Sequence, residues 1–139
     1  MKREALSYAF KLLSKRDYFS SELKDKLVKK GFDPEESDQV VQYLVQKGYL
    51  DDQKLKERLS SLLKEKGKSP IYIKKKFYSK GVEPPEISYD EEFETAYNLL
   101  KKKYKKEKQF HTVVKFLKNR GFSYSVIIDV ANKFLEEEE

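Results

Sequence analysis

The 139-residue sequence contains no cysteine, which excludes a disulfide framework, a cysteine nucleophile and cysteine-ligated metal sites. With a single histidine, His111, metal sites built on paired histidines are excluded as well. The five glycines are isolated, so there is no glycine-rich phosphate loop. No apolar run approaches the roughly 20 residues of a membrane span, and no signal-peptide segment opens the sequence. We predict a cytoplasmic, non-enzymatic protein with no cofactor, no bound metal and no membrane contact.

Charge, by contrast, is abundant. Lys, Arg, Asp and Glu make up 39% of the residues, and 30 basic against 24 acidic side chains leave a net charge of +6. The hydrophobic content of 38% is low for a single deep core and fits small modules that each bury a narrow stripe. The positive surplus favours a polyanion, or an assembly of protein and nucleic acid, as the partner. Solvated helix faces are the alternative explanation of the same charges.

An apolar register recurs three times around a glycine. It is formed by Leu23, Leu27 and Gly31, then by Ile73, Phe77 and Gly81, and then by Val113, Leu117 and Gly121. Each glycine is followed by a hydrophobic residue, a pattern typical of a helix that ends in a left-handed C-cap. The flanking apolar residues have helical rather than strand periodicity. We predict an all-α fold of elongated tandem three-helix repeats, with helices near 2–15, 20–30, 34–47, 52–66, 70–80, 89–105, 107–119 and 124–137.

Capping residues define the ends of these helices. We expect N-caps or capping boxes at Asp33 with Glu36, at Ser69 before Pro70, at Ser88 with Glu91, at Asp51 with Asp52 in the first turn, and at Ser20 and Ser123; we expect C-caps at Gly48 and Gly67.

The middle repeat is shorter than its neighbours. The first two repeat glycines are 50 residues apart, but the second and third are only 40 apart. The missing residues fall where Pro84 and Pro85 disfavour helix. We therefore predict three repeats, at 1–48, 49–88 and 89–139, the middle one lacking most of its third helix and ending in a proline-rich connector over 82–88.

Lysines gather in three clusters that are candidates for contact with a polyanion or its protein assembly. They are Lys24, Lys26, Lys29 and Lys30; Lys74, Lys75, Lys76 and Lys80; and Lys101, Lys102, Lys105 and Lys106. The first two clusters occupy corresponding repeat positions, and we expect them to form one stripe. Favourable interaction with helix C-termini is the alternative role of these lysines.

A set of short motifs resembles the RecX regulatory family. It consists of Gly31, the run Gly48, Tyr49, Leu50, Asp51 and Asp52, then Gly67, Pro70 and Ile73, and then Gly81. The resemblance covers essentially the whole chain and is clearest over residues 5–82. It gives these motif residues a structural role and implies an all-helical chain of three-helix repeats.

The same resemblance implies a partner. RecX proteins bind the filament that the RecA recombinase forms on DNA, lie in its groove, inhibit its activities and also contact DNA. We therefore expect a monomer that modulates the recombinase, ATPase and coprotease activities of a RecA filament, with single- or double-stranded DNA as a weaker partner. A stand-alone basic helical DNA-binding protein is the alternative from another class.

Overall fold

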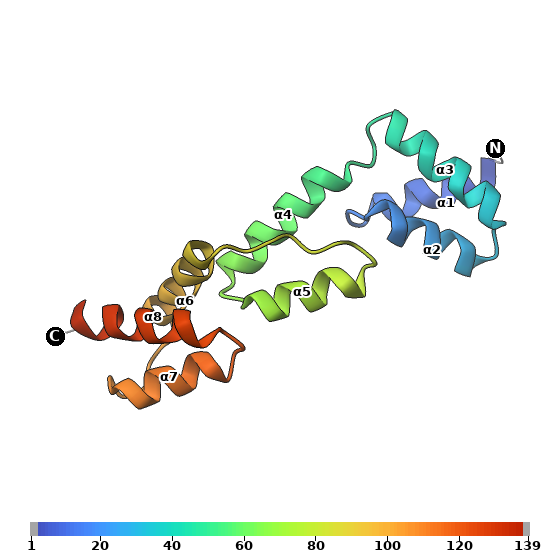
Figure 1. Ribbon diagram of the computed structural model, residues 1–139. Helices are drawn as coiled ribbons and strands as arrows, with labels where there is room; N and C mark the ends of the chain where they lie inside the picture. The colour runs from blue at the N-terminus through green and yellow to red at the C-terminus, as the bar shows by residue number, and fades with distance from the viewer. Residues whose placement is uncertain (1–2, 138–139) are drawn as a thin grey trace. The chain divides into compact units, whose positions relative to one another are not determined.

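The structure is a computed structural model that describes residues 3–137, and all regular structure in that range is helical (Figure 1). The helices are α1 (Arg3–Leu13), α2 (Ser20–Lys30), α3 (Pro34–Gln46), α4 (Asp52–Glu65), α5 (Pro70–Ser79), α6 (Tyr89–Lys103), α7 (Phe110–Lys118) and α8 (Tyr124–Glu137). The all-α prediction is confirmed, and seven of the eight helices begin within a residue of their predicted start. Met1, Lys2, Glu138 and Glu139, which belong to the outer predicted repeats, lie outside the described residues.

The connector between α5 and α6 has no regular structure. Residues 82–88 form no helical turn, and Figure 1 shows an irregular segment between these two helices. Neither Pro84 nor Pro85 has an amide N–H to donate to a helix, and each disfavours the helical conformation of the residue before it. The prediction that the middle repeat lacks its third helix is thereby confirmed.

Two compact units make up the chain. The first contains the residues up to Arg58 together with Tyr78–Glu83, and the second contains Leu59–Phe77 together with the residues from Pro84 onward. The division falls inside α4 and inside α5. The assignment of three repeats to 1–48, 49–88 and 89–139 is a different partition, made on the sequence register, and stays a proposal.

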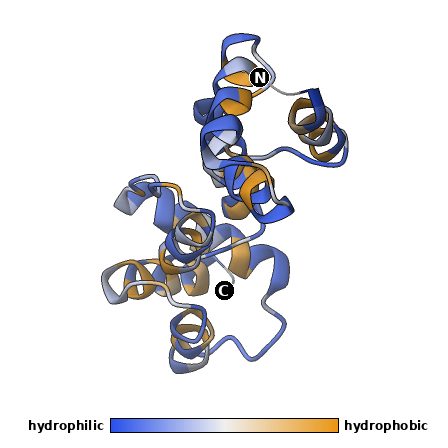
Figure 2. Cartoon of the chain, turned by 90° about the vertical axis from the view of Figure 1, so that its right-hand side faces the viewer, coloured by the Kyte–Doolittle hydropathy of each residue, from blue (hydrophilic) through white to orange (hydrophobic). Residues whose placement is uncertain are grey.

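In the first unit, α1, α2 and α3 pack against one another around a small core. Its buried side chains include both register residues of α2, Leu23 and Leu27. In the second unit, α8 packs against α6 and α7, with Val113 and Leu117 buried at the equivalent positions. Hydrophobic residues occupy limited stretches of mostly hydrophilic helices (Figure 2). Each unit therefore buries narrow stripes, as the low hydrophobic content predicts.

Left-handed glycines terminate the helices. All five have positive φ, from +70° at Gly81 to +116° at Gly31. At the end of α2, the Gly31 N–H donates to the Val28 carbonyl and the Phe32 N–H donates to the Leu27 carbonyl, which is the Schellman arrangement. The C-cap predictions are confirmed.

Most of the predicted N-caps are also confirmed. The Asp33 side chain accepts from the Glu35 N–H, and Pro34 occupies the first turn of α3. Ser88 and Glu91 form the predicted capping box of α6. The Ser69 hydroxyl accepts from the Tyr72 N–H at the start of α5.

The two remaining serine predictions differ in outcome. Ser20 is not an N-cap: it is the first residue of α2 after the N-cap Phe19, and its N–H and hydroxyl both donate to Asp52. Ser123 does occupy the position before α8, and its carbonyl accepts from the Ile127 N–H, while its own N–H and hydroxyl donate to the largely buried Glu92 carboxylate. In both cases the hydroxyl donates to a distant carboxylate, which local sequence does not reveal.

The start of α7 also differs from the prediction, at Phe110 rather than residue 107. Tyr104 leaves the helical conformation, and its buried ring packs edge-on against Phe116 and Phe134. Its hydroxyl donates to the Glu107 carbonyl. Anchoring the tyrosine in this way holds residues 104–109 out of helix.

Candidate interaction surfaces

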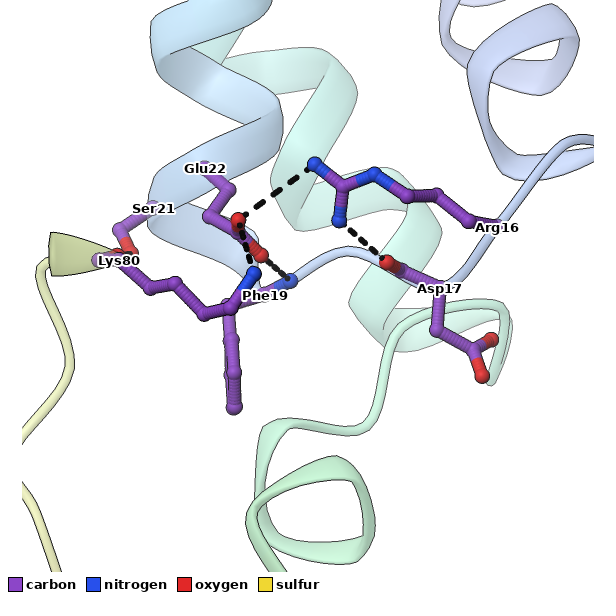
Figure 3. Close-up of polar contacts among 6 residues, drawn as sticks. All are labelled: Arg16, Asp17, Phe19, Ser21, Glu22 and Lys80. Atoms are coloured by element: carbon purple, nitrogen blue, oxygen red, sulfur yellow. Dashed lines mark hydrogen bonds and ion pairs between the residues drawn. The ribbon is translucent and has the colours of Figure 1, made fainter. Parts of the chain in front are cut away.

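Glu22 is the centre of a polar network at the start of α2 (Figure 3). Its carboxylate accepts from the Phe19 N–H at 3.0 Å and so caps the helix. The same carboxylate pairs with Lys80 at 3.1 Å and with Arg16 at 3.5 Å. The Ser21 hydroxyl donates to the Lys80 carbonyl. The network therefore joins the start of α2 to Lys80, which is 58 residues away in the sequence.

This network gives Lys80 a structural partner. Lys80 lies one residue beyond the end of α5, whereas the sequence predicts a helix over 70–80 that includes it. Its side chain is only 21% exposed and that of Glu22 only 13%. Lys80 thus attaches residues 78–83 to α2, within the first unit.

The turn from α3 to α4 contains the Gly-Tyr-Leu-Asp-Asp motif. Gly48 adopts a φ of +82°, and Leu50 inserts into the core of the first unit. Asp51 is the N-cap of α4 and accepts from the Lys54 N–H at 3.1 Å, and Asp52 holds the start of α2 through Ser20. Four of the five motif residues therefore have a structural task.

Tyr49 is the exception in this motif. Its side chain is 58% exposed, and its ring meets the edge of Phe10 with 5.0 Å between the centroids. Tyr49 lines a cleft of about 490 Å³ together with Leu13 and Leu55, and the exposed ion pair of Asp17 and Arg58 is at its rim. An exposed aromatic pair beside a cleft of mixed polar and apolar lining is the type of surface that anchors a protein partner.

The lysines of α2 differ in their surroundings. Lys24 pairs with Asp38 of α3 at 3.0 Å, and the Lys30 ammonium lies over the ring of Tyr8 at 5.2 Å from its centroid. Lys26 and Lys29 are exposed. The predicted cluster therefore contains one paired lysine, one that covers an aromatic ring and two that face solvent.

Helix α5 presents a mixed basic and aromatic surface. Lys74, Lys75 and Lys76 are exposed, as are Ile71 and Tyr72 in the first turn. Lys68 lies over the Tyr72 ring at 4.7 Å. Pro70 begins the helix, and the motif residue Ile73 is buried. The binding role of the α5 lysines, and the single stripe that they were expected to form with the α2 lysines, stay predictions.

The third lysine cluster lies at the end of α6 and in the segment after it. Lys101, Lys102, Lys105 and Lys106 are all exposed, the last two in the irregular segment before α7. Lys101 lies 5.1 Å from the centroid of the Tyr97 ring. The contacts of these lysines with a partner remain a prediction.

An aromatic row on α6 was not among the predicted site residues. Tyr89, Phe93 and Tyr97 follow one another at every fourth position, with ring centroids 6.1 and 6.4 Å apart. Lys133 of α8 lies over Tyr97 at 4.6 Å and over Phe93 at 5.6 Å. The i, i+4 spacing was the available signal, but the lysine that completes the row comes from another helix.

Two titratable groups of α6 are perturbed by defined partners. The Tyr89 hydroxyl donates to Asp129 of α8, and this hydrogen bond raises the pKa of Tyr89 to about 12. Lys64 of α4 pairs with Glu91 and holds the pKa of that carboxyl below its ordinary value. Both pairs connect helices, so their electrostatics serve the fold of the second unit.

Within residues 3–137, no three histidine, aspartate or glutamate side chains converge in a way that could hold a metal ion. No helix in the same range is long and apolar enough to cross a membrane.

The fold and its surfaces define a class: an all-helical protein of small units whose exposed features are basic and aromatic surfaces. Residues 5–44 match the family model described as the first three-helix domain of RecX. The chain is 32% identical to the regulatory protein RecX of Trichlorobacter lovleyi, over 90% of this chain and 92% of that protein. Its identity to the protein of the same name from Chlorobium limicola is 33%, over 97% and 92%. The chain belongs to the RecX family of regulatory proteins.

The fold agrees with this assignment. A crystal structure of RecX from Lactobacillus salivarius resembles the chain with a TM-score of 0.75, over 94% of each chain and at 17% sequence identity. The relatives are named as regulatory proteins and not as members of an enzyme family.

Proposed function

We propose that this protein binds the filament that a RecA recombinase forms on DNA, lies in its groove, and inhibits recombinase, ATPase and coprotease activity. The observation that carries the proposal is identity to proteins named regulatory protein RecX over about nine tenths of the chain, through both compact units. The protein acts as a monomer, without cofactor or catalytic residue, in the cytoplasm, where such filaments form.

The mechanism that fits these surfaces is steric and electrostatic. The Tyr49 cleft offers an anchor for a protein side chain, and exposed lysines on α2, α5 and α6 offer contacts to acidic groups or phosphates. Several weak contacts on one chain gain affinity because each bound site raises the effective concentration of the next. Contacts that bridge neighbouring protomers would impede the protomer motion coupled to ATP hydrolysis.

The direct test is the DNA-dependent ATPase activity of the cognate RecA on single-stranded DNA, titrated with this protein. We expect suppression well below one molecule per recombinase protomer, because a bridging molecule affects more than one protomer. Excess DNA should not relieve the suppression. Inhibition that begins only when the protein can coat the DNA, and that excess DNA reverses, would contradict the proposal.

The second candidate is a stand-alone DNA-binding protein, which the net charge of +6 and the exposed lysines favour. It predicts tight binding to bare DNA with a steep salt dependence and no requirement for the recombinase. Binding to filaments and to bare DNA at matched salt separates the two candidates. A large preference for the filament supports the first, and equal affinity supports the second.

A further inference from the structure

A basic groove lies along α1, and of the residues in the predicted lysine clusters only Lys30 lines it. It has a volume of about 620 Å³. Its positive charges come from Arg3 and Lys11 on α1, from Lys15 just after that helix, and from Lys30 at the end of α2. The remaining lining residues are Glu4, Ser7, Tyr8 and Leu12. The lining of the groove therefore contains four cations and a single carboxylate, and its charge is positive.

The cations of the first unit differ in whether a carboxylate is paired with them. Elsewhere in the first unit, Arg16, Lys24, Arg58 and Lys80 are each paired with a carboxylate. Among the described residues, Arg3, Lys11 and Lys15 form no such pair, and all three are exposed. Several cations of the first unit are thus engaged by carboxylates, whereas the three on and just after α1 keep their positive charge available in this groove.

The spacing of these charges suits an extended polyanion. Arg3, Ser7 and Lys11 follow one another at every fourth residue and so lie along one side of α1. At 1.5 Å per residue, the helix separates Arg3 from Lys11 by about 12 Å. This length matches roughly three or four phosphates at the spacing of one strand of B-form DNA. The Ser7 hydroxyl, between the two cations, adds a hydrogen-bond donor of the kind that contacts phosphate oxygens.

We propose that this groove binds the sugar–phosphate backbone of a DNA strand, and that it does so through Arg3, Lys11, Lys15 and Lys30. The proposal rests on the proposed function in one respect: the strand is taken to be that of the recombinase filament. The readout is sequence-independent, because the contacts are to phosphates and not to bases. The groove would give the first unit a DNA contact separate from the Tyr49 cleft.

The test measures binding of the full chain to a fluorescently labelled oligothymidylate by anisotropy over a range of salt concentrations. The double variant Lys11→Gln and Lys15→Gln removes two charges from the groove. The matched control, Lys66→Gln and Lys115→Gln, removes two exposed charges that neither line the groove nor belong to the lysines proposed above as contacts. Each phosphate contact on a single strand contributes about −0.7 to the slope of log K against log salt, so the groove variant should have a slope shallower by about 1.4. The control should keep the slope of the unaltered chain.

Three results would overturn the proposal. One is equal slope changes in both variants, and a second is no detectable binding of the unaltered chain to the oligonucleotide at low salt. The third is an unchanged DNA slope together with weaker binding of polyglutamate to the groove variant, which would assign the groove to an acidic protein segment. The ATPase titration is independent of all three, so a chain that suppresses the filament without binding bare DNA would refute the groove and keep the proposed function.

Discussion

Replacing Lys80 with methionine distinguishes a structural lysine from a partner-binding lysine. The sequence groups Lys80 with the α5 lysines as a candidate contact, whereas the structure pairs it with Glu22 at 3.1 Å. Methionine retains most of the aliphatic length of the side chain but removes the ammonium. We expect Lys80→Met to destabilise the first unit, because a carboxylate that is mostly buried loses its nearest cation.

The structure sets the size of this effect. A hydrogen bond to a charged group contributes about 1.5–3 kcal/mol. Arg16 stays 3.5 Å from Glu22, and the carboxylate still accepts from Phe19, so we place the loss near the lower limit, at about 1.5 kcal/mol. That is roughly a tenfold change in the folding equilibrium. The control, Lys24→Met, breaks a pair whose side chains are 39% and 52% exposed, and should cost at most about 0.5 kcal/mol.

Native-state amide hydrogen exchange measures the local stability of both variants, because it reports the opening of α2 and of residues 78–83 separately. Urea unfolding followed by circular dichroism gives the overall change in stability. We expect faster exchange at both places in Lys80→Met and nearly unchanged exchange in Lys24→Met. If the two variants lose the same stability, or if Lys80→Met weakens filament binding without any change in exchange, the structural role of Lys80 is refuted.

Three other predictions concern Gly67, Tyr89 and Tyr49. Gly67→Ala should lower the free energy of unfolding by about 2–4 kcal/mol, because φ is +78° and the new Cβ would lie 2.7 Å from Leu99. In a Leu99→Ala background, urea unfolding should show a smaller loss of stability, and strict additivity of the two substitutions would contradict this reasoning. The ring resonance of Tyr89, followed by NMR, should titrate near pH 12, and in Asp129→Asn its pKa should fall toward the ordinary range. Since the folded pKa of Tyr89 is raised, the stabilisation is complete below about pH 10 and is lost as pH rises through about 12; titration of this resonance near pH 10 in the unaltered chain would contradict the prediction. Tyr49→Ala should weaken filament binding about tenfold or more in a filament pull-down while unfolding remains unchanged, and unaltered binding would remove the cleft from the interface.

The helices of this chain could be predicted because their signals are local. Gly31 ends α2 and Asp33 begins α3, and each does so through contacts within a few residues. The missing helix after α5 follows from two consecutive prolines in the same local way. Helical periodicity then identifies the buried residues, since a stripe of fixed spacing is all that each small unit buries.

Contacts between elements distant in sequence could not be predicted. Ser20 is a residue type that favours the N-cap position, but it lies inside the first turn of α2, and its hydroxyl donates to Asp52, 32 residues away. Lys80 belongs to a lysine cluster whose binding role stays a prediction, and only the fold shows that it pairs with Glu22. The groove on α1 was missed for a related reason, because its cations are spaced along a helix instead of being clustered. A search for basic residues at every fourth position would have found Lys11 and Lys15, but only the fold brings Lys30 of the first predicted cluster to them.

The same contrast indicates how binding residues should be chosen in a chain with 30 basic side chains. A run of lysines reports local composition, whereas availability for a partner depends on the carboxylates that the fold brings near each lysine. Replacement of Lys24 or Lys80 disturbs an internal pair, so lost binding in such a variant would confuse instability with recognition. Lys11 and Lys75 are exposed, and within residues 3–137 neither forms an ion pair that its replacement would break. Such positions test recognition directly, because any loss of affinity must then arise at the partner.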